Sequence, residues 1–264
     1  VSIVSPKIQT TRRVIRGIAV IGEAQVIFLD TPGFCSPSSP LEKALLANFR
    51  KSYKDADLVL LVIDATVRSH RKSVRFIEHA ETANAPVVVV INKIDAVKKE
   101  SLLKIADIIS QYKHIQNVFM ISALTNDGTD SLKGFLEMSA IDGPWLYEDT
   151  QITDSTMSFR LAEITREKIF TKLKKELPYS TYVETELFHE SEKKATVYQS
   201  IVIMKDSQKG IALGHGGSMI RSIKNDAIAD MIALLNKKVT LKLFVKVREK
   251  WTEKKEHLHN AGII

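Results

Sequence analysis

Cysteine is almost absent from this sequence, with Cys35 as its only copy among 264 residues. One cysteine cannot build a disulfide framework within the chain or a cysteine-cluster metal site, which favours a reducing cytosol. Long apolar runs are missing too. No run approaches the roughly 18 residues that span a bilayer, and no signal peptide opens the chain. The chain begins at Val1 rather than Met, and we expect that upstream sequence has been lost.

The composition that is present describes a globular protein. Hydrophobic residues make up 44% and charged residues 26%, and the length leaves room for two domains. The net charge of +7 is unevenly spread: residues 205–264 hold 12 basic and 6 acidic side chains, whereas residues 1–150 hold 18 and 17. This surplus predicts a C-terminal module that binds a polyanion, with a merely solvated basic face as the alternative.

The most informative stretch is residues 87–95. Five consecutive apolar, mostly β-branched residues predict a strand buried on both faces, and the strand ends in Asn92-Lys93-Ile94-Asp95. Ligands bind at the carboxyl ends of such strands. The Asp95 carboxylate suits two adjacent donors, which guanine presents and adenine does not. Asn92 can tie neighbouring loops, and the Lys93 stem can cover the base. Alone, the motif could be an ordinary polar turn.

A second motif follows a predicted hairpin of strands at 17–21 and 24–30. Asp30-Thr31-Pro32-Gly33 places an acid at a strand end, where it can hold Mg²⁺ through water. The glycine lets its backbone N–H approach a terminal phosphate. By itself this sequence also fits a turn with proline at its second position.

Strands and helices alternate through the first half of the chain, which predicts a doubly wound α/β domain over 1–142. Residues 34–40 are expected to form a switch loop. The other expected strands cover 58–63 and 118–121, the latter followed by Ser122-Ala123, which could contact a base. The expected helices are 41–54, one that carries Val74 and Ile77, 100–112 and 129–140.

The second half has a different pattern. A linker over 143–156 precedes a predicted α+β domain over 157–264. Its expected order is a helix at 158–176, strands at 181–188 and 196–204, a helix that reaches Leu213, the turn Gly214-His215-Gly216-Gly217, a helix at 219–235 and a strand at 239–247. A G-x-x-G turn between helices lets backbone press against nucleic acid. In this order it predicts a KH RNA-binding module, with Ile211, Ile220 and Ile223 expected to line the groove.

The chain as a whole resembles the Era GTPases, bacterial proteins that join a GTPase domain to a KH domain. The resemblance rests on residues 9–12 (Q-T-T-R), 30–33, 92–95, 176–180 (E-L-P-Y-S) and 245–247 with Trp251. It implies GTP hydrolysis with Mg²⁺, binding to the 3′ end of small-subunit ribosomal RNA, and action in assembly of the small ribosomal subunit. It also implies a cytoplasmic monomer with a peripheral contact to the inner membrane.

The resemblance also implies a role for individual residues. Metal binding falls to Thr11 and Asp30, and RNA binding to Gly214, His215, Gly216, Gly217, Arg221 and Lys224. Nucleotide binding falls to Asp30, Thr31, Pro32, Gly33, Phe34, Asn92, Lys93, Ile94, Asp95, Ser122 and Ala123.

Three departures from the family pattern matter. The phosphate-binding loop, G-x-x-x-x-G-K followed by Ser or Thr, is not supplied by residues 1–16, and the first strand and helix go with it. Phe34 stands where some GTPases orient water with Gln, so no side-chain base is assigned. His215 replaces the Lys or Arg common in KH loops.

These departures leave three interpretations open. The first is an Era-type GTPase that is incomplete at its N-terminus. The alternatives are an RNA-binding KH protein with a vestigial, non-hydrolysing GTPase half, and the product of a decayed gene.

Overall fold

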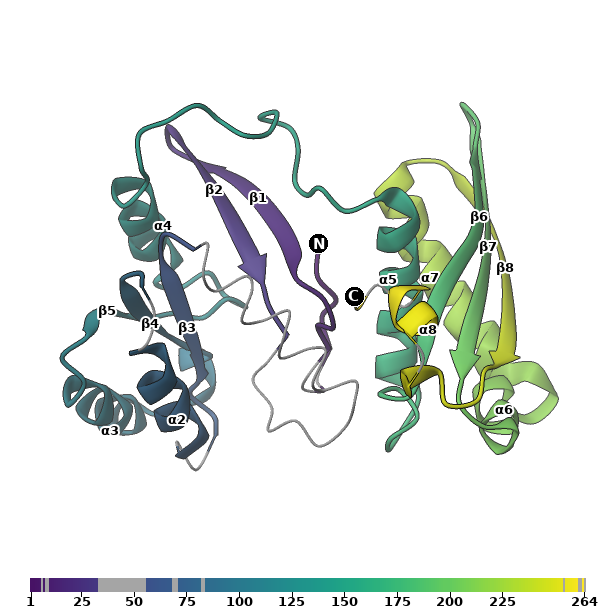
Figure 1. Ribbon diagram of the computed structural model, residues 1–264, viewed down its shortest axis with the longest axis horizontal. Coiled ribbons are helices and arrows are strands. Elements are labelled where there is room, and N and C mark those ends of the chain that lie inside the picture. The colour runs from purple at the N-terminus through teal and green to yellow at the C-terminus, as the bar shows by residue number, and fades with distance from the viewer. Residues whose placement is uncertain are drawn as a thin grey trace. The chain divides into compact units, whose positions relative to one another are not determined.

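The structure, a computed structural model, describes residues 1–5, 7, 10–32, 56–67, 71–81, 84–253, 255–260 and 263. Three parallel strands organise the first half: β3 (Val59–Asp64), β4 (Val87–Asn92) and β5 (Ile115–Met120), in the order β3-β4-β5 (Figure 1). All five apolar residues of β4 are buried, because this strand lies between two others and has packed side chains on both faces. The strand predicted at 87–91 is confirmed.

Helices α2 (Arg71–Ala80), α3 (Lys99–Ser110) and α4 (Thr129–Met138) belong to the same compact unit as this sheet. Ile77 of α2 and Ile105 of α3 share one buried cluster with Val89 and Ile91, so these helices cover the same face. Val88 and Val90 point to the other face, since side chains alternate along a strand. The α/β alternation expected from sequence is therefore present. The predicted loop at 34–40 and helix at 41–54 lie outside the described residues.

Strands β1 (Ile15–Ile21) and β2 (Ala24–Asp30) form the expected hairpin but make a sheet of their own. Among the described strands, no ladder joins this hairpin to the β3-β4-β5 sheet, and β3 is an edge strand. Val62 of β3 consequently exposes 62% of its surface, although it sits in an apolar strand and pairs in register with the buried Val90.

The KH-like half contains α5 (Met157–Lys172), β6 (Tyr182–Glu190), β7 (Lys194–Ile203), α6 (Asp206–Leu213), α7 (Ser218–Leu235) and β8 (Lys238–Val247). Strand β7 is central, antiparallel to β6 and parallel to β8. Figure 1 shows α5 and α7 along one face of this sheet, and Ile169, Ile201 and Ile223 pack between them. The chain continues through η3 (Trp251–Glu253) into α8 (Lys255–Asn260).

Two local predictions in this half were wrong. Helix α5 ends at Lys172 rather than 176, because Leu173 adopts extended backbone and is buried, while the Lys7 ammonium donates to the carbonyls of Phe170 and Leu173. The sequence of 181–188 also predicts a simple alternation, with Tyr182, Glu184 and Glu186 on one face and Val183, Thr185 and Leu187 on the other, and this alternation fails in the structure. A register shift between Thr185 and Leu187 turns Leu187 to solvent, so that Phe188 packs on the core instead.

The chain divides into two compact units. One comprises the described residues within Val1–Gly17, Leu29–Phe49 and Ile152–Ile264, and the other those within Ile18–Phe28 and Arg50–Gln151. The described residues among 1–17, which we assigned to the 1–142 domain, thus pack with the KH-like half. None of the described helices is both long and apolar enough to cross a membrane.

Candidate functional site

Asn92 joins the ends of two neighbouring strands. Its Oδ1 accepts hydrogen bonds from the backbone N–H of Lys93 at 2.8 Å and of Ala123 at 3.0 Å. Ala123 follows β5, so one side chain at the end of β4 holds both loops together. A second tie runs from the Ile94 N–H to the Ile121 carbonyl at 3.2 Å. The role in loop bridging that the sequence suggested for Asn92 is therefore present in the structure.

The side chain of Lys93 reaches the carboxyl end of β3. Its backbone is left-handed, with φ of 67°, and its Nζ lies 2.6 Å from Oδ2 of Asp64. Asp64 ends β3 and lies in register with Asn92. Thr66 donates to Asp64 through its backbone N–H at 2.9 Å and its hydroxyl at 2.6 Å. Asp64 thus belongs to the site, and the pattern of the strand predicted at 58–63 gave no sign of this role.

The Asp64 carboxyl is biased towards its charged form. Partial burial raises the pKa of Asp64. The hydrogen bonds from Lys93 and Thr66, together with the charge of Lys93, lower the pKa by a larger amount, so the net pKa lies below the ordinary value. A carboxylate that stays ionised fixes the Lys93 ammonium. The aliphatic stem of Lys93 then runs from the end of β4 to the end of β3, where it can cover a flat ligand.

The other residues of this rim divide by exposure. Asp95 lies in the short helix η1 (Ile94–Ala96) with its carboxylate exposed. Ala123 is exposed as well, although its backbone N–H is already bonded to Asn92. Ser122 is fully buried and its hydroxyl accepts from the Thr125 N–H at 3.1 Å, so the expected contact between this hydroxyl and a base is not available. Ser122 instead shapes the loop that presents Ala123.

Thr11 and Asp30, both predicted to bind metal, lie together in the other unit. The Thr11 hydroxyl donates to Oδ2 of Asp30 at 3.1 Å. Both offer hard oxygen atoms, which Mg²⁺ prefers, and Mg²⁺ is usually held by one or two protein oxygens together with waters and nucleotide phosphates. No group of three or more His, Cys, Asp or Glu side chains forms a metal site among the described residues. The pair therefore fits a Mg²⁺ ion that arrives with a nucleotide.

The neighbours of Asp30 are only partly described. Thr31 is partly exposed and Pro32 is buried, whereas Gly33 and Phe34 lie outside the described residues.

A buried arginine fixes the position of Thr11. Arg12 donates to three carbonyl oxygens at the turn after α5: those of Thr181 at 2.7 Å, Tyr179 at 2.8 Å and Pro178 at 3.1 Å. Its guanidinium also lies 5.8 Å from the ring centre of Trp251. Burial, and then the charge of Arg166, lower the pKa of Arg12 to about 9, so it remains charged at neutral pH. Sequence analysis treated this segment only as part of the family pattern and missed its anchor.

Further contacts hold the same segment. Arg166, itself paired with Glu163 at 2.6 Å, donates to the Thr10 carbonyl at 2.6 Å. The Arg13 guanidinium stacks 3.3 Å from the ring centre of Phe159. Thr11 is thus flanked on both sides by residues bound to the KH-like half. Within this unit, the predicted metal position and the KH fold are joined by one short stretch of backbone.

The turn at Gly214–Gly217 has the geometry of a backbone contact site. Gly214, Gly216 and Gly217 all have positive φ (72°, 56° and 77°), and the Gly217 N–H donates to the Gly214 carbonyl at 3.0 Å. A Cβ on Gly214 would come within 2.7 Å of both the Cβ and N of Met219. The space around Gly216 is open, and His215 and Gly216 are exposed. The exposed tip can therefore meet a ligand backbone directly.

Cations flank this turn. Arg221, one turn into α7, is exposed, and its Nη1 lies where it would meet a Cβ on Gly217 at 3.1 Å. Lys224 follows three residues later, near the same face of the helix. Of the apolar residues expected to line a groove, Ile211 is 59% exposed and Ile220 partly exposed. Ile223 is fully buried in the core, so that prediction was wrong for Ile223.

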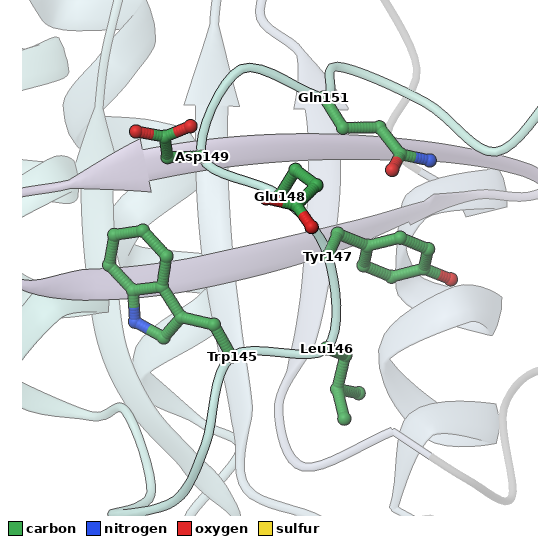
Figure 2. Close-up of a pocket in the computed structure, with 6 residues that line it drawn as sticks. All are labelled: Trp145, Leu146, Tyr147, Glu148, Asp149 and Gln151. Atoms are coloured by element: carbon green, nitrogen blue, oxygen red, sulfur yellow. The ribbon is translucent and has the colours of Figure 1, made fainter.

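The connecting segment forms an open hollow of about 630 Å³ lined by Trp145, Leu146, Tyr147, Glu148, Asp149 and Gln151 (Figure 2). Gln25 of β2 holds this segment through bonds with Leu146 and Tyr147 backbone atoms at 2.8–3.1 Å. All six lining residues come from one stretch of chain, and none belongs to the predicted nucleotide site. The hollow carries no functional assignment.

Fold and sites together define a class: a GTPase-type α/β domain joined to a KH domain. Residues 1–93 match the family described as 50S ribosome-binding GTPases, and residues 176–252 match the KH domain family. The chain belongs to the Era GTPase family. It is 42% identical over its whole length to the GTPase Era of Rhizobium meliloti and 39% identical to that of Bradyrhizobium diazoefficiens, and it spans 84% and 86% of those proteins.

Two solved structures are similar to the whole chain. One is Era in complex with MgGDPNP and nucleotides 1506–1542 of 16S ribosomal RNA, with a TM-score of 0.92, 31% identity and coverage of 90% of that chain. The other is a variant of Era from Aquifex aeolicus bound to GDP·AlF4⁻, with a TM-score of 0.92, 30% identity and the same coverage.

Proposed function

We propose that this protein binds and hydrolyses GTP with Mg²⁺, binds the 3′ end of small-subunit ribosomal RNA and acts in assembly of the small ribosomal subunit. The observation that carries the proposal is the full-length similarity to an Era structure that holds both a GTP analogue and 16S ribosomal RNA. We propose the small subunit, although the matched GTPase family is described as 50S ribosome-binding, because the 16S ribosomal RNA in that Era structure belongs to the small subunit.

The geometry supports the nucleotide half of this proposal. Asn92 and Lys93 fix the rim at the carboxyl ends of β3, β4 and β5, and leave the Asp95 carboxylate exposed to pair with a base edge. Thr11 and Asp30 would hold the Mg²⁺ ion, which supplies charge neutralisation at the phosphates when bound. Gly33 and Phe34 are proposed to contact the terminal phosphate, with no side-chain base on the attacking water.

The geometry also supports the RNA half. The exposed Gly214–Gly217 turn can approach a phosphodiester backbone, while Arg221 and Lys224 add positive charge beside it. We propose domain limits of 1–142 and 157–264 with a linker over 143–156, while the strap of residues 1–17 packs on the second domain. The protein is proposed to be a cytoplasmic monomer with a peripheral contact to the inner membrane. Sedimentation velocity and flotation with anionic vesicles test those two statements.

A finer proposal concerns the 264-residue chain as printed: it neither binds GTP tightly nor hydrolyses it. The sequence contains no G-x-x-x-x-G-K loop, which supplies most backbone N–H groups around phosphates. The edge position of β3 and the exposed Val62 support this, because they leave one border of the nucleotide sheet without a neighbour among the described residues. The alternative, an RNA-binding protein with a vestigial GTPase half, rests on the same two observations.

Calorimetry with GTP and Mg²⁺ tests these statements. The printed chain should show no binding tighter than micromolar, and sub-micromolar binding would overturn the finer proposal. The same chain preceded by its native upstream residues should bind GTP if these include the phosphate-binding loop. An upstream reading frame with a stop codon in place of that loop would instead favour the vestigial alternative.

A further inference from the structure

The outer face of the KH sheet, opposite α5 and α7, carries large apolar side chains in contact with solvent. Leu187 of β6 exposes 54% of its surface and Phe244 of β8 exposes 50%. Tyr198 of β7 pairs in register with Leu187 on one side and Lys242 on the other. Sheet faces that only meet water are usually polar. This patch of Leu187, Tyr198 and Phe244 therefore indicates a surface that something covers.

The chain itself covers only one end of this face. Trp251 and Leu258 pack over Tyr182 and Val202, which are buried as a result. Beyond them lies a polar belt in which Glu186 accepts from Lys246 at 2.5 Å and from Ser200. Leu187 lies past the belt and Phe244 lies in register with Ser200 of the belt, and each keeps about half of its surface exposed. The uncovered part begins where the packing of η3 and α8 ends.

The charge of the uncovered part is positive. Outward positions of β8 alternate with its core positions, and all of them are exposed: Lys238, Thr240, Lys242, Phe244 and Lys246. Lys194 lies in register with Lys238 and adds a further cation. The nearby carboxylates of Glu186 and Glu190 are already paired, with Lys246 and with Lys237. Among the described residues, none forms an ion pair with Lys194, Lys238 or Lys242.

From this combination we infer that the outer face of the KH sheet is a second RNA-binding surface, on which unpaired bases stack against Tyr198 and Phe244 while Lys238 and Lys242 contact phosphates. Aromatic side chains on an open sheet, flanked by cations, suit single-stranded nucleic acid because every base has a stacking face. A duplex would not expose its bases to such rings. This surface lies on the opposite side of the sheet from the helices that carry the Gly214–Gly217 turn, so it goes beyond the proposed function.

The two surfaces can be tested separately. The double variant His215→Asp with Gly216→Asp puts carboxylates on the turn and disables the first surface. In that background, the full chain should keep salt-sensitive binding to a fluorescent oligouridine of about twelve nucleotides, read by anisotropy. Adding Tyr198→Ala and Phe244→Ala should weaken this binding at least about fivefold, since stacking on each base is worth roughly that much or more.

Matched variants show whether the loss comes from stacking. Phe244→Tyr keeps a ring and should retain affinity. Leu103→Ala with Lys104→Glu, on the exposed side of α3, removes an exposed apolar side chain and reverses a charge elsewhere and should have no effect. Because Phe244 is half exposed, the sheet variants should keep the wild-type circular dichroism. RNA that contains 4-thiouridine should crosslink to the peptide that contains Tyr198 or Phe244.

Unchanged oligouridine affinity in the sheet variant, or crosslinks confined to the Gly214–Gly217 turn, would overturn the inference. A wild-type dimer that Phe244→Ala dissociates, with RNA affinity unchanged, would assign the face to contact between two copies and would overturn it equally. If the double variant of His215 and Gly216 binds oligouridine as tightly as the wild type, the proposed RNA contact at the turn is wrong. The comparison of the sheet variants with their own background still tests the second surface.

Discussion

The guanidinium of Arg12 donates to the carbonyl oxygen of Thr181 at 2.7 Å, although 169 positions separate the two residues. The same side chain satisfies two more carbonyls of the E-L-P-Y-S turn, at Pro178 and Tyr179. These three bonds bind an N-terminal strap to the KH-like half. The residue before Arg12 is Thr11, whose hydroxyl contacts Asp30, so the strap also sets the position of a predicted metal ligand.

Replacing Arg12 should destabilise this unit substantially. Arg12→Ala leaves three buried carbonyls without a donor, and we expect the free energy of unfolding to fall by about 3 kcal/mol. Urea unfolding followed by tryptophan fluorescence measures this, since Trp251 lies beside the guanidinium. Arg16→Ala is the control, because its bond to Asp154 is largely exposed and should cost less than about 1 kcal/mol. If the two variants lowered the free energy of unfolding equally, Arg12 would not be the anchor of the N-terminal strap.

Removing Lys93 should change how Asp64 titrates. In the folded protein the pKa of Asp64 lies below its ordinary value of 3.8. The stabilisation that Asp64 provides is therefore present above that pH and is lost as the pH falls through the folded pKa. In Lys93→Ala we expect the pKa of Asp64 to rise, as measured by NMR titration of its carboxyl carbon. Lys98→Ala, a nearby exposed lysine, should leave it unchanged.

The glycines of the G-x-x-G turn should differ in their tolerance of a side chain. Gly214→Ala forces a methyl group against Met219 at 2.7 Å and a left-handed φ, and should distort the turn and weaken RNA binding by more than tenfold. Gly216→Ala meets open space and should cost only the backbone penalty, about 1 kcal/mol. Thermal melts and RNA anisotropy compare the pair. Similar losses in both variants would mean that the turn is not packed as described.

Asp95→Asn should change base preference in a form of the protein that carries a phosphate-binding loop. A carboxylate can accept from two donors of guanine, whereas an amide presents one donor and one acceptor and suits xanthine. Sites built on such pairing reject the wrong base by roughly 10⁴-fold, because buried groups are left unpaired. Competition between GTP and XTP measures the change. An unaltered ratio would remove Asp95 from the base site.

Sequence patterns recovered the parts of this fold that depend on neighbours along the chain. The five apolar, mostly β-branched residues before Asn92 are typical of a buried strand, and the three glycines within 214–217 favour a turn. Patterns did not reveal Asp64 as the partner of Lys93. That pairing follows from the parallel register of β3 with β4, which aligns Asp64 with Asn92.

The failures share a physical cause. The exposure of Leu187 depends on one extra residue in β6, and a bulge of that kind leaves no mark in hydrophobic periodicity. The early end of α5 depends on Lys7, which bonds its last turn from a distant part of the chain. The burial of Ile223 depends on its packing against Ile169 of α5 and Ile201 of β7. Each is settled by tertiary contacts rather than by local propensity.

Among the described residues β3 is an edge strand, and this position affects how long the protein stays dispersed in solution. An apolar strand at a sheet border offers amide and carbonyl groups to any extended segment that approaches, and natural proteins usually blunt such borders with charge or proline. Between Val59 and Ile63, β3 has neither, and Val62 adds an exposed side chain. Shelf life should therefore shorten as concentration rises, and a lysine in place of Val62 should lengthen it.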